Sequence, residues 1–257
     1  MKLEIHSTSI VDKSVKIPEN TTIGPYSIIE SDVSLGEGVK IASNVLIKSG
    51  TIIGNKCEIF SGAIIGEKPQ DLKYNNEKTL VEIGDNCIIR EYVTIHKGTK
   101  DRKITKVGSN CLLMAYSHVA HDTFLGDNVI LSNNVQVGGH VTIEDNVIIG
   151  GATPIHQFCK IGEHAFVGGG YRVVQDVPPY IKAMGEPLKY FGINSIGLKR
   201  NNFSENIIRT IKKAYRVIYR SEHNILQAIK ILDENSNSRS EVKKIINFIT
   251  NSNRGII

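Results

Sequence analysis

Histidine is the side chain best suited to acid–base chemistry near neutral pH, because its imidazole titrates in that range. Four of the eight histidines in this chain fall in one short region, at His118, His121, His140 and His156. His121 is followed directly by Asp122, and a carboxylate beside an imidazole can fix its tautomer for work as a general base. A lone histidine is more often packed or solvated, so the interpretation depends on how the chain arranges the four.

An aliphatic residue recurs at every sixth position through this region. From Ile5 to Val173, every such position is Ile, Leu or Val except Asp71, Glu77 and Asp101. Small or β-branched residues repeatedly precede the next aliphatic residue by two positions, so both point to the same side of an extended strand. Each hexad therefore predicts one side of a prism, and three hexads predict a coil of about 18 residues. The stacked coils form a parallel β-helix.

This lattice of hexads places the four histidines on one outward edge of the prism, on three successive coils about 4.8 Å apart. The same count puts His96 and His164 on other faces. Glycine often follows the aliphatic residue, as at Gly24, Gly36 and Gly54, and is expected to supply the backbone conformation of each corner. Four imidazoles gathered on one edge predict a functional site.

The repeat is interrupted twice, and each time it resumes with the same sixfold spacing. This predicts external loops at about 67–80 and 96–106. The prolines of QDVPPY (175–180) remove ladder donors and are expected to end the β-helix, which would then fill residues 1–177. Residues 178–257 are predicted to form a C-terminal α-helical domain. The fold class is therefore mostly β, with a helical domain after the repeats.

The helical region is basic, with 14 Lys and Arg against 6 Asp and Glu from residue 178 onwards. Ser204 can N-cap its first helix, and further helices are expected at about 222–233 and 240–251. Such a concentration of positive charge suggests an acidic protein partner. The expected docking residues are Lys212, Lys213 and Arg216.

Other features limit the class of protein. The sequence has neither an N-terminal apolar signal region nor an apolar run of about 18 residues, so we expect a cytoplasmic protein without an integral membrane segment. We expect no nucleic-acid partner. The cysteines all fall on inward hexad positions and form no Cys-x-x-Cys pair, which predicts buried free thiols. They are Cys57, Cys87, Cys111 and Cys159.

Several short motifs together resemble one family from end to end. They are IGEKPQDLKY (65–74), TIHKGT (94–99), SHVAHD (117–122), GGH (138–140), IHQF (155–158), QDVPPY (175–180) and GLKR (197–200). With these motifs the chain resembles the acyl-carrier-protein-dependent UDP-N-acetylglucosamine O-acyltransferases, which begin lipid A synthesis. The resemblance implies a left-handed β-helix, an exception to the usual right-handed crossover.

The resemblance also implies roles for three residues. His121 matches the general base that removes the proton from the sugar 3-hydroxyl as it attacks the thioester of a 3-hydroxyacyl carrier protein. Asp122 matches the carboxylate that orients this base, although neighbouring residues can pair only where the chain turns a corner. The backbone amide of Gly139 matches the oxyanion donor, a role that suits glycine because it allows close approach.

The remaining matches concern substrate binding. Sugar, diphosphate, nucleotide and acyl-chain contacts are implied for Asp71, Lys73, His118, His140, His156, Gln157, Asn194 and Arg200. Gly169 matches the position that limits acyl length. The chain departs from the family at Ile196, where an acidic nucleotide contact is common, and at Asn201, where a second arginine is common. These departures leave a 3-amino acceptor sugar open as an alternative to the 3-hydroxyl.

The family resemblance further implies a homotrimer, a UDP-sugar acceptor, and an acyl donor carried by phosphopantetheine on acyl carrier protein, with no metal or other cofactor. Three alternatives use the same scaffold. A zinc carbonic anhydrase would use histidines across a trimer interface as metal ligands. A small-molecule acetyltransferase would use coenzyme A, and a non-enzymatic β-helix would not need the histidines.

Overall fold

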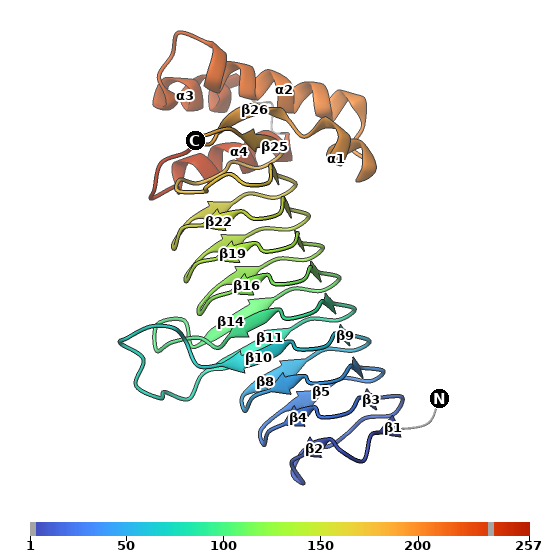
Figure 1. Ribbon diagram of the computed structural model, residues 1–257. Coiled ribbons are helices and arrows are strands. Elements are labelled where there is room, and N and C mark those ends of the chain that lie inside the picture. The colour runs from blue at the N-terminus through green and yellow to red at the C-terminus, as the bar shows by residue number, and fades with distance from the viewer. Residues whose placement is uncertain (1–3, 236–238) are drawn as a thin grey trace.

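The computed structural model describes residues 4–235 and 239–257 as a long β-helix with helices packed over one end (Figure 1). Its coils are left-handed, and three sheets, here called faces A, B and C, form the sides of the prism. The pairing is parallel within the β-helix, as in Ile10↔Ile28 on face B. The predicted left-handed parallel β-helix with a C-terminal helical region is confirmed.

The strands of the three faces alternate along the chain. Face A contains β1 (Glu4–Ile5), β3 (Thr22–Ile23), β6 (Lys40–Ile41), β9 (Glu58–Ile59), β12 (Ile88–Ile89), β15 (Leu112–Leu113), β18 (Ile130–Leu131), β21 (Ile148–Ile149), β24 (Phe166–Val167), β25 (Ile181–Met184) and β26 (Lys189–Ile193). Face B contains β2 (Ile10–Val11), β4 (Ile28–Ile29), β7 (Leu46–Ile47), β10 (Ile64–Glu67), β13 (Thr94–His96), β16 (His118–Val119), β19 (Gln136–Val137) and β22 (Pro154–Ile155). Face C contains β5 (Ser34–Leu35), β8 (Thr51–Ile53), β11 (Leu80–Ile83), β14 (Ile104–Val107), β17 (Phe124–Leu125), β20 (Thr142–Ile143) and β23 (Lys160–Ile161).

The core of the prism is filled by the aliphatic residue of each hexad and by the small residue two positions before it. Ile65 and Val119, for example, are fully buried. At several positions where the small residue is polar, its side chain donates to a backbone carbonyl of the next coil, whereas the hydroxyls of Thr21 and Ser117 are buried with no hydrogen-bond partner among the described residues. Thr123 Oγ1 lies 3.1 Å from the carbonyl of Gly138, and Cys57 Sγ lies 3.1 Å from that of Gly84. The four cysteines are buried free thiols, as the hexad pattern predicted.

The expected role of the glycine after each aliphatic residue is wrong at most positions, although Gly66, with a φ of 82°, does adopt the left-handed conformation. The left-handed backbone conformation falls later in the corner, for example at Asn44 and at Asn128, both with φ of 57°. The glycine is needed because successive coils approach closely at its position. A Cβ added to Gly24 would lie 2.7 Å from the carbonyl carbon of Ala42, and one added to Gly36 would lie 2.5 Å from Gly54.

Two loops project from the edge between faces B and C, where Figure 1 shows them side by side. The first comprises residues 68–79, between β10 and β11, and the second comprises residues 97–103, between β13 and β14. Both are shorter than the expected 67–80 and 96–106, because the flanking residues are drawn into the strands. The edge from which they project is called the B–C edge below.

The strand ladder extends beyond the expected boundary at residue 177. β25 pairs in parallel with β24, and β26 pairs antiparallel with β25, so both lengthen face A. Four helices follow, at α1 (Ser195–Arg200), α2 (Glu205–Arg220), α3 (Ile225–Asn235) and α4 (Ser240–Thr250). α1 lies in the stretch expected to be a linker, while the Ser204 cap of α2 is confirmed, since its side chain accepts from the Ile207 amide.

Aromatic stacking joins the helices to the end of the β-helix. The ring of Tyr190 on β26 lies 5.6 Å from that of Tyr215 and 4.4 Å from that of Tyr219, both on α2. The buried Tyr215 hydroxyl also donates to the carbonyl of Pro179. The helices are therefore fixed to the end of the β-helix. None of the helices in the described part of the chain is long and apolar enough to cross a membrane.

Candidate active site

His121 and Asp122 form a hydrogen-bonded pair at the B–C edge. Adjacent residues can pair here because Asp122 has a φ of 57°, which turns the chain sharply between β16 and β17. The distance from His121 Nδ1 to Asp122 Oδ2 is 2.9 Å. The Asp122 side chain is fully buried, whereas that of His121 is 13% exposed. The pair thus has a buried carboxylate and an imidazole that reaches the surface.

Hydrogen bonds from several donors keep Asp122 ionised. Burial alone would raise the pKa of its carboxyl, but hydrogen bonds from His121 and Thr99 outweigh burial and lower the pKa to about 2. An ionised carboxylate can only accept, so His121 Nδ1 must carry the proton in this bond. The Nε2 atom of His121 is therefore unprotonated when the ring is neutral, as a general base requires.

Gly139 lies next to His121, on the following coil of the β-helix. A Cβ added there would lie 2.7 Å from both Nε2 and Cε1 of His121, so any side chain would collide with the imidazole. The Gly139 amide has no hydrogen-bond acceptor among the described residues. The Gly139 backbone thus lies against the Nε2 end of His121 with an N–H group available to a ligand.

Other imidazoles surround this pair. The His140 ring lies edge-on to that of His121, with centroids 5.1 Å apart, and its Nδ1 is 3.2 Å from Asp101 Oδ2. His118 Nδ1 lies 2.7 Å from the hydroxyl of Thr94 on β13. Burial is the main cause that lowers the pKa of His118, to about 4, and it also lowers the pKa of His140. Both rings are therefore neutral near pH 7 and can hydrogen-bond to uncharged hydroxyl groups.

The sequence count misplaced His96. Its ring lies edge-on to that of His118, with centroids 4.8 Å apart, so it belongs to the same cluster. The count failed because the loop at 97–103 inserts an extra hexad: Thr94 pairs with His118, a separation of 24 residues rather than 18. His96 is 5% exposed, and its Nδ1 is buried without a hydrogen-bond partner among the described residues. Its pKa is lowered by burial.

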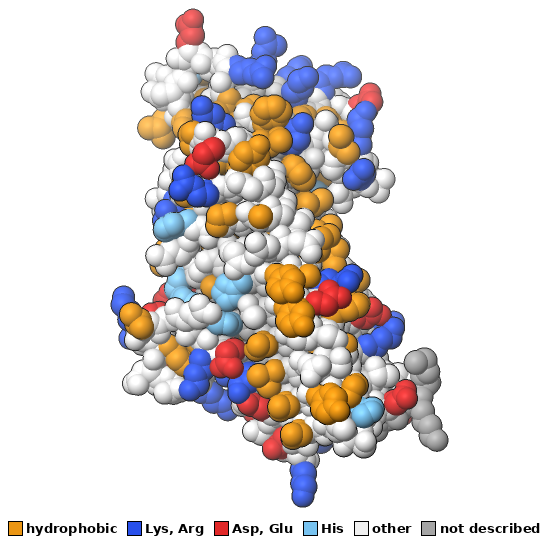
Figure 2. All heavy atoms as spheres, viewed as in Figure 1, with side chains coloured by type: hydrophobic (Ala, Val, Ile, Leu, Met, Phe, Trp, Pro, Cys, Tyr) orange, Lys and Arg blue, Asp and Glu red, His pale blue; other side chains and the backbone are white. Residues whose placement is uncertain are grey.

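His156 and Gln157 continue the B–C edge on the coil beyond His140. Both are exposed, and His156 Nδ1 lies 3.1 Å from the Gln157 carbonyl. Phe158 follows them and stacks on the His140 ring with centroids 4.6 Å apart. Figure 2 shows histidine side chains gathered on this face, near the projecting loops. The edge thus forms an exposed strip beyond the His121–Asp122 pair.

Proteins of one enzyme family match this chain along its length. A protein from Herminiimonas arsenicoxydans is 45% identical over 258 residues, with 98% of each chain covered, and one from Syntrophobacter fumaroxidans is 40% identical over 257 residues, with 99% and 100% covered. Both are acyl-[acyl-carrier-protein]–UDP-N-acetylglucosamine O-acyltransferases. The chain belongs to this acyltransferase family.

Solved structures and family models agree with this membership. The UDP-N-acetylglucosamine acyltransferase from Bacteroides fragilis superposes with a TM-score of 0.95 at 44% identity, over 98% of this chain and 99% of that one. The enzyme from Francisella novicida superposes with a TM-score of 0.96 at 38% identity, over 98% and 93%. A bacterial transferase hexapeptide model matches residues 14–49 and 104–139, and a model for domain 2 of UDP-N-acetylglucosamine O-acyltransferase matches 176–257.

A metal ion would be an alternative use of the central residues of this acyltransferase. The ligand atoms of His121, Asp122 and His140 lie within 4.8 Å of one another. The Asp122 carboxylate, however, already accepts hydrogen bonds from Thr99, Arg102 and His121. With its lone pairs engaged, the carboxylate is better suited to orient an imidazole than to ligate a metal.

The structure does not bring every expected site residue of the acyltransferase together. Asp71 and Lys73 lie in the loop at 68–79, where the Lys73 amide donates to Asp71 Oδ1 at 2.9 Å. The side chain of Leu72 between them is fully exposed, at 107%. Gly169 lies at the edge between faces A and B, exposed beyond β24. These residues therefore occupy a projecting loop and a different edge from His121.

Asn194 and Arg200, which were also expected to contact substrate, differ in their surroundings. Asn194 is 8% exposed, and both ends of its amide are engaged: Nδ2 donates to the His164 carbonyl at 2.9 Å, and Oδ1 accepts from Gly197 N at 3.1 Å. It caps α1 and ties that helix to the β-helix, a structural use that the sequence did not indicate. Arg200 is exposed at the end of α1 and is free to reach a ligand.

The predicted docking residues lie on the outer surface of the acyltransferase. Lys212, Lys213 and Arg216 on α2 are all exposed, while the opposite side of the helix, including Ile211 and Tyr215, is buried. Figure 2 shows Lys and Arg side chains gathered over the helices at this end of the molecule. The surface is therefore suited to contact an acidic partner.

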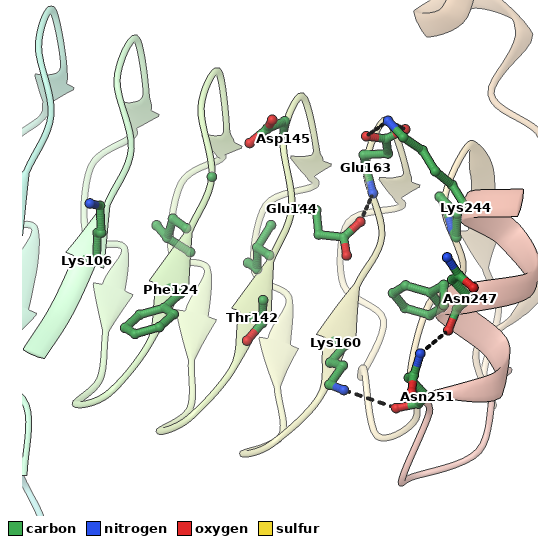
Figure 3. A pocket seen from close by; sticks show the side chains of 15 residues that line it. Lys106, Phe124, Thr142, Glu144, Asp145, Lys160, Glu163, Lys244, Asn247 and Asn251 are labelled. Carbon is green, nitrogen blue, oxygen red and sulfur yellow. Dashed lines mark hydrogen bonds and ion pairs between the residues drawn. The ribbon is translucent and has the colours of Figure 1, made fainter. Parts of the chain in front are cut away.

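A separate groove of about 590 Å³ lies between face C and α4 (Figure 3). Its lysines are engaged within the fold: Lys244 Nζ lies 2.8 Å from Glu163 Oε1, and Lys160 Nζ donates to the carbonyl of Asn251 at 3.1 Å. None of the histidines at the B–C edge lines it. The contacts of these lysines therefore join α4 to the β-helix, and the groove is not part of the candidate active site.

Proposed function

We propose that this chain transfers a 3-hydroxyacyl group from acyl carrier protein to the 3-position of UDP-N-acetylglucosamine, the opening reaction of lipid A synthesis. The carrier-protein donor and the sugar-nucleotide acceptor are those for which the relatives are named. The observation that carries the proposal is the buried Asp122 carboxylate fixing an unprotonated Nε2 on His121, beside the available amide of Gly139.

In the proposed reaction, His121 Nε2 removes the proton from the sugar 3-hydroxyl while the hydroxyl oxygen attacks the thioester carbonyl carbon. The Gly139 N–H donates to the oxyanion that develops on the carbonyl oxygen. Collapse of the tetrahedral intermediate breaks the carbon–sulfur bond, and the departing thiolate takes the proton from the His121 imidazolium. Asp122 stabilises that imidazolium without becoming protonated, because its carboxylate remains bound by several donors.

The direct test is mass spectrometry of the products from UDP-N-acetylglucosamine and mixed 3-hydroxyacyl carrier proteins. The expected product is an O-acylated UDP-sugar, labile to mild alkali, formed equally with and without a chelator. The corresponding 3-amino sugar, supplied in competition, tests the alternative acceptor by giving an alkali-stable amide. Product formed only from coenzyme A thioesters would contradict the proposal and support the acetyltransferase alternative.

We further propose that the working form is a homotrimer. On a single chain the His121 pair lies on an open edge, while Asp71 and Lys73 project in a loop and Gly169 lies on another edge. Catalytic sites are usually enclosed clefts, and a neighbouring copy packed against this edge would create one. Sedimentation equilibrium should give three times the chain mass of 28.4 kDa, and a monomer with full activity would exclude this assembly.

The reaction is proposed to take place in the cytoplasm and to need no metal or other cofactor. Free thiols at Cys57, Cys87, Cys111 and Cys159 are consistent with a reducing compartment. The prosthetic phosphopantetheine belongs to the carrier protein in this scheme, not to the chain itself. The hydrogen bonds that fill the Asp122 carboxylate support a metal-free site.

The α2 surface is proposed to dock acyl carrier protein. Reversing Lys212, Lys213 and Arg216 to glutamate should raise KM for the carrier protein by roughly tenfold, with kcat nearly unchanged, because opposite charges steer and hold the acidic partner. Rising salt should raise KM for the wild type more than for the variant, since salt screens exposed charges. Steady-state kinetics at several ionic strengths would measure both effects.

The matched control reverses Lys13, Lys16 and Lys56, which are exposed in the N-terminal coils at the other end of the β-helix. It makes the same change in net charge and should leave KM for the carrier protein within about twofold. Equal effects of the two triple variants would show that net charge, and not the α2 surface, sets carrier affinity.

Gly169 is proposed to limit the acyl pocket. Its lack of a side chain leaves room for a long chain, so Gly169→Met should shift the preference to shorter acyl groups by filling the end of the pocket. A Cβ at this position would lie 3.0 Å from the Gly151 carbonyl oxygen, so some strain accompanies any substitution. Gly169→Ala carries that strain with little added length and serves as the control.

The measurement is kcat/KM across a series of acyl chain lengths. Gly169→Met should move the optimum, whereas Gly169→Ala should lower all rates in similar proportion. An unchanged optimum in Gly169→Met would place the limiting residue elsewhere, with Tyr171 and Pro187 as the next candidates.

A further inference from the structure

The loop at 97–103 folds back over the carboxylate of Asp122. The Thr99 amide donates to Oδ1 at 3.0 Å and the Thr99 hydroxyl donates to Oδ2 at 2.7 Å. The amide of Arg102 donates to Oδ1 at 3.2 Å. Thr99 is 7% exposed and Asp122 is fully buried, so these bonds are shielded from water. Low local dielectric strengthens such bonds, and the charge on the acceptor strengthens them further.

These donors, together with His121, fill the carboxylate. A carboxylate has about four lone-pair sites, and Asp122 uses two on each oxygen. Oδ2 is shared between the Thr99 hydroxyl and His121 Nδ1, so the hydroxyl fixes the direction in which this oxygen faces the imidazole. His140 Nε2 lies 3.7 Å from the same oxygen, beyond hydrogen-bond range. A carboxylate freed from the hydroxyl could turn towards His140 instead.

The loop is itself held rigidly. The Arg102 guanidinium donates to the Asp122 backbone carbonyl at 2.8 Å and lies over the Phe124 ring at 4.9 Å. The Lys103 amide donates to the Thr99 carbonyl at 2.8 Å, which closes the loop on itself. A Cβ on Gly98 would lie 2.3 Å from the Ile104 nitrogen, so the loop packs tightly where it begins. The Thr99 hydroxyl is therefore presented to Asp122 in one position.

We propose that Thr99 is a positioning residue for the reaction, the outer member of a Thr99–Asp122–His121 relay. Its hydroxyl holds the carboxylate, the carboxylate holds Nδ1–H of His121, and Nε2 is thereby aimed at the acceptor hydroxyl. This inference rests on the proposed acyl transfer with His121 as the base. It assigns the loop at 97–103 a role in catalysis in addition to its place in the fold.

Thr99→Val tests the relay, because valine keeps the shape of threonine but removes the hydroxyl. We expect kcat to fall by about 10- to 100-fold, the range for loss of one hydrogen bond to a charged group, with KM for both substrates within about twofold. Thr99→Ser restores the hydroxyl and should retain most of the wild-type kcat. A purely structural role would instead lower the midpoint of thermal unfolding in step with activity.

The matched control is Thr79→Val. The Thr79 hydroxyl is also buried, at the end of the other loop, but it has no hydrogen-bond partner among the described residues. Its removal should leave kcat unchanged.

Asp101→Ala tests an alternative route, from Thr99 through Asp101 to His140. The Asp101 amide donates to the Thr99 hydroxyl at 3.3 Å, and the Asp101 carboxylate, which this substitution removes, contacts His140. A loss in Asp101→Ala equal to that in Thr99→Val would overturn the relay through Asp122.

A double variant completes the test. Once Asp122→Asn has broken the link to His121, adding Thr99→Val should lower kcat by no more than about twofold, because residues that act through one another are not additive. Full additivity, or wild-type kcat in Thr99→Val alone, would reject the relay. Neither result would contradict the proposed function, which is tested separately by acyl transfer with the wild-type protein.

Discussion

Replacing His121 with alanine is expected to lower kcat by roughly 10²–10⁴-fold, the contribution of a positioned general base. A sugar hydroxyl is a poor nucleophile until its proton is removed, and His121 is the imidazole whose Nδ1 is fixed by a buried carboxylate. The side chain points away from the core of the prism, so the β-helix should fold normally. Single-turnover kinetics would measure the chemical step without interference from product release.

Two alanine variants provide controls for this result. His6 is exposed in the first coil, far from the B–C edge, so His6→Ala should retain the wild-type kcat. His118→Ala should mainly raise the KM for substrate, because His118 is held by Thr94 and is not paired with a carboxylate. If His121→Ala kept more than about a tenth of the wild-type kcat with chemistry limiting, the base would be another residue. His140 would then be the next candidate.

The fold could be predicted because one short period controls it. An aliphatic residue at every sixth position buries the same side of every short strand, so the core of the prism follows directly from the repeat. The reason for the glycines could not be predicted, because the contact between Gly24 and Ala42 arises only when coils stack. The helix α1 was missed because it has only six residues and follows a stretch rich in glycine and proline.

The candidate site was predictable where it depended on the repeat and unpredictable where it depended on the loops. The count of coils put His118, His121 and His140 on one edge, and the structure brings these rings close together. The same count put His96 elsewhere, because the loop at 97–103 changes the number of hexads between paired strands. Thr99 lies inside that loop, and no periodicity in the sequence links a loop residue to the carboxylate that it holds.

Asp122→Asn alone is expected to lower kcat by a factor of the order of 10²–10⁴ relative to the wild type, while the protein stays folded. An amide in place of the carboxylate has one acceptor oxygen for the N–H and O–H donors that converge there. Its NH₂ group facing His121 would favour the tautomer with the proton on Nε2, which cannot act as a base. The analogous change in a Ser-His-Asp triad costs about 10⁴ in kcat for this reason.

The effect of Asp122→Asn can also be measured independently of activity, through the pH dependence of the free energy of unfolding. The folded-state pKa of Asp122, about 2, lies below the ordinary aspartate value of 3.8, so its ionised form stabilises the folded protein above the higher value. This contribution is lost progressively as the pH falls from about 4 towards 2. Denaturant unfolding across this range should therefore show a steeper loss for the wild type than for Asp122→Asn.

Asp127→Asn separates the catalytic effect from the general effect of losing a carboxylate that accepts from a backbone amide, although Asp127 itself is exposed. Asp127 Oδ1 accepts from the Ser109 amide at 2.7 Å on a different edge of the prism, so it stabilises a corner in the same way but touches no histidine. Its replacement should cost some stability and leave kcat near the wild-type value. Should Asp122→Asn also keep near wild-type kcat, the carboxylate would be only a structural anchor for the loop at 97–103. His121 would then acquire its tautomer from the substrate itself.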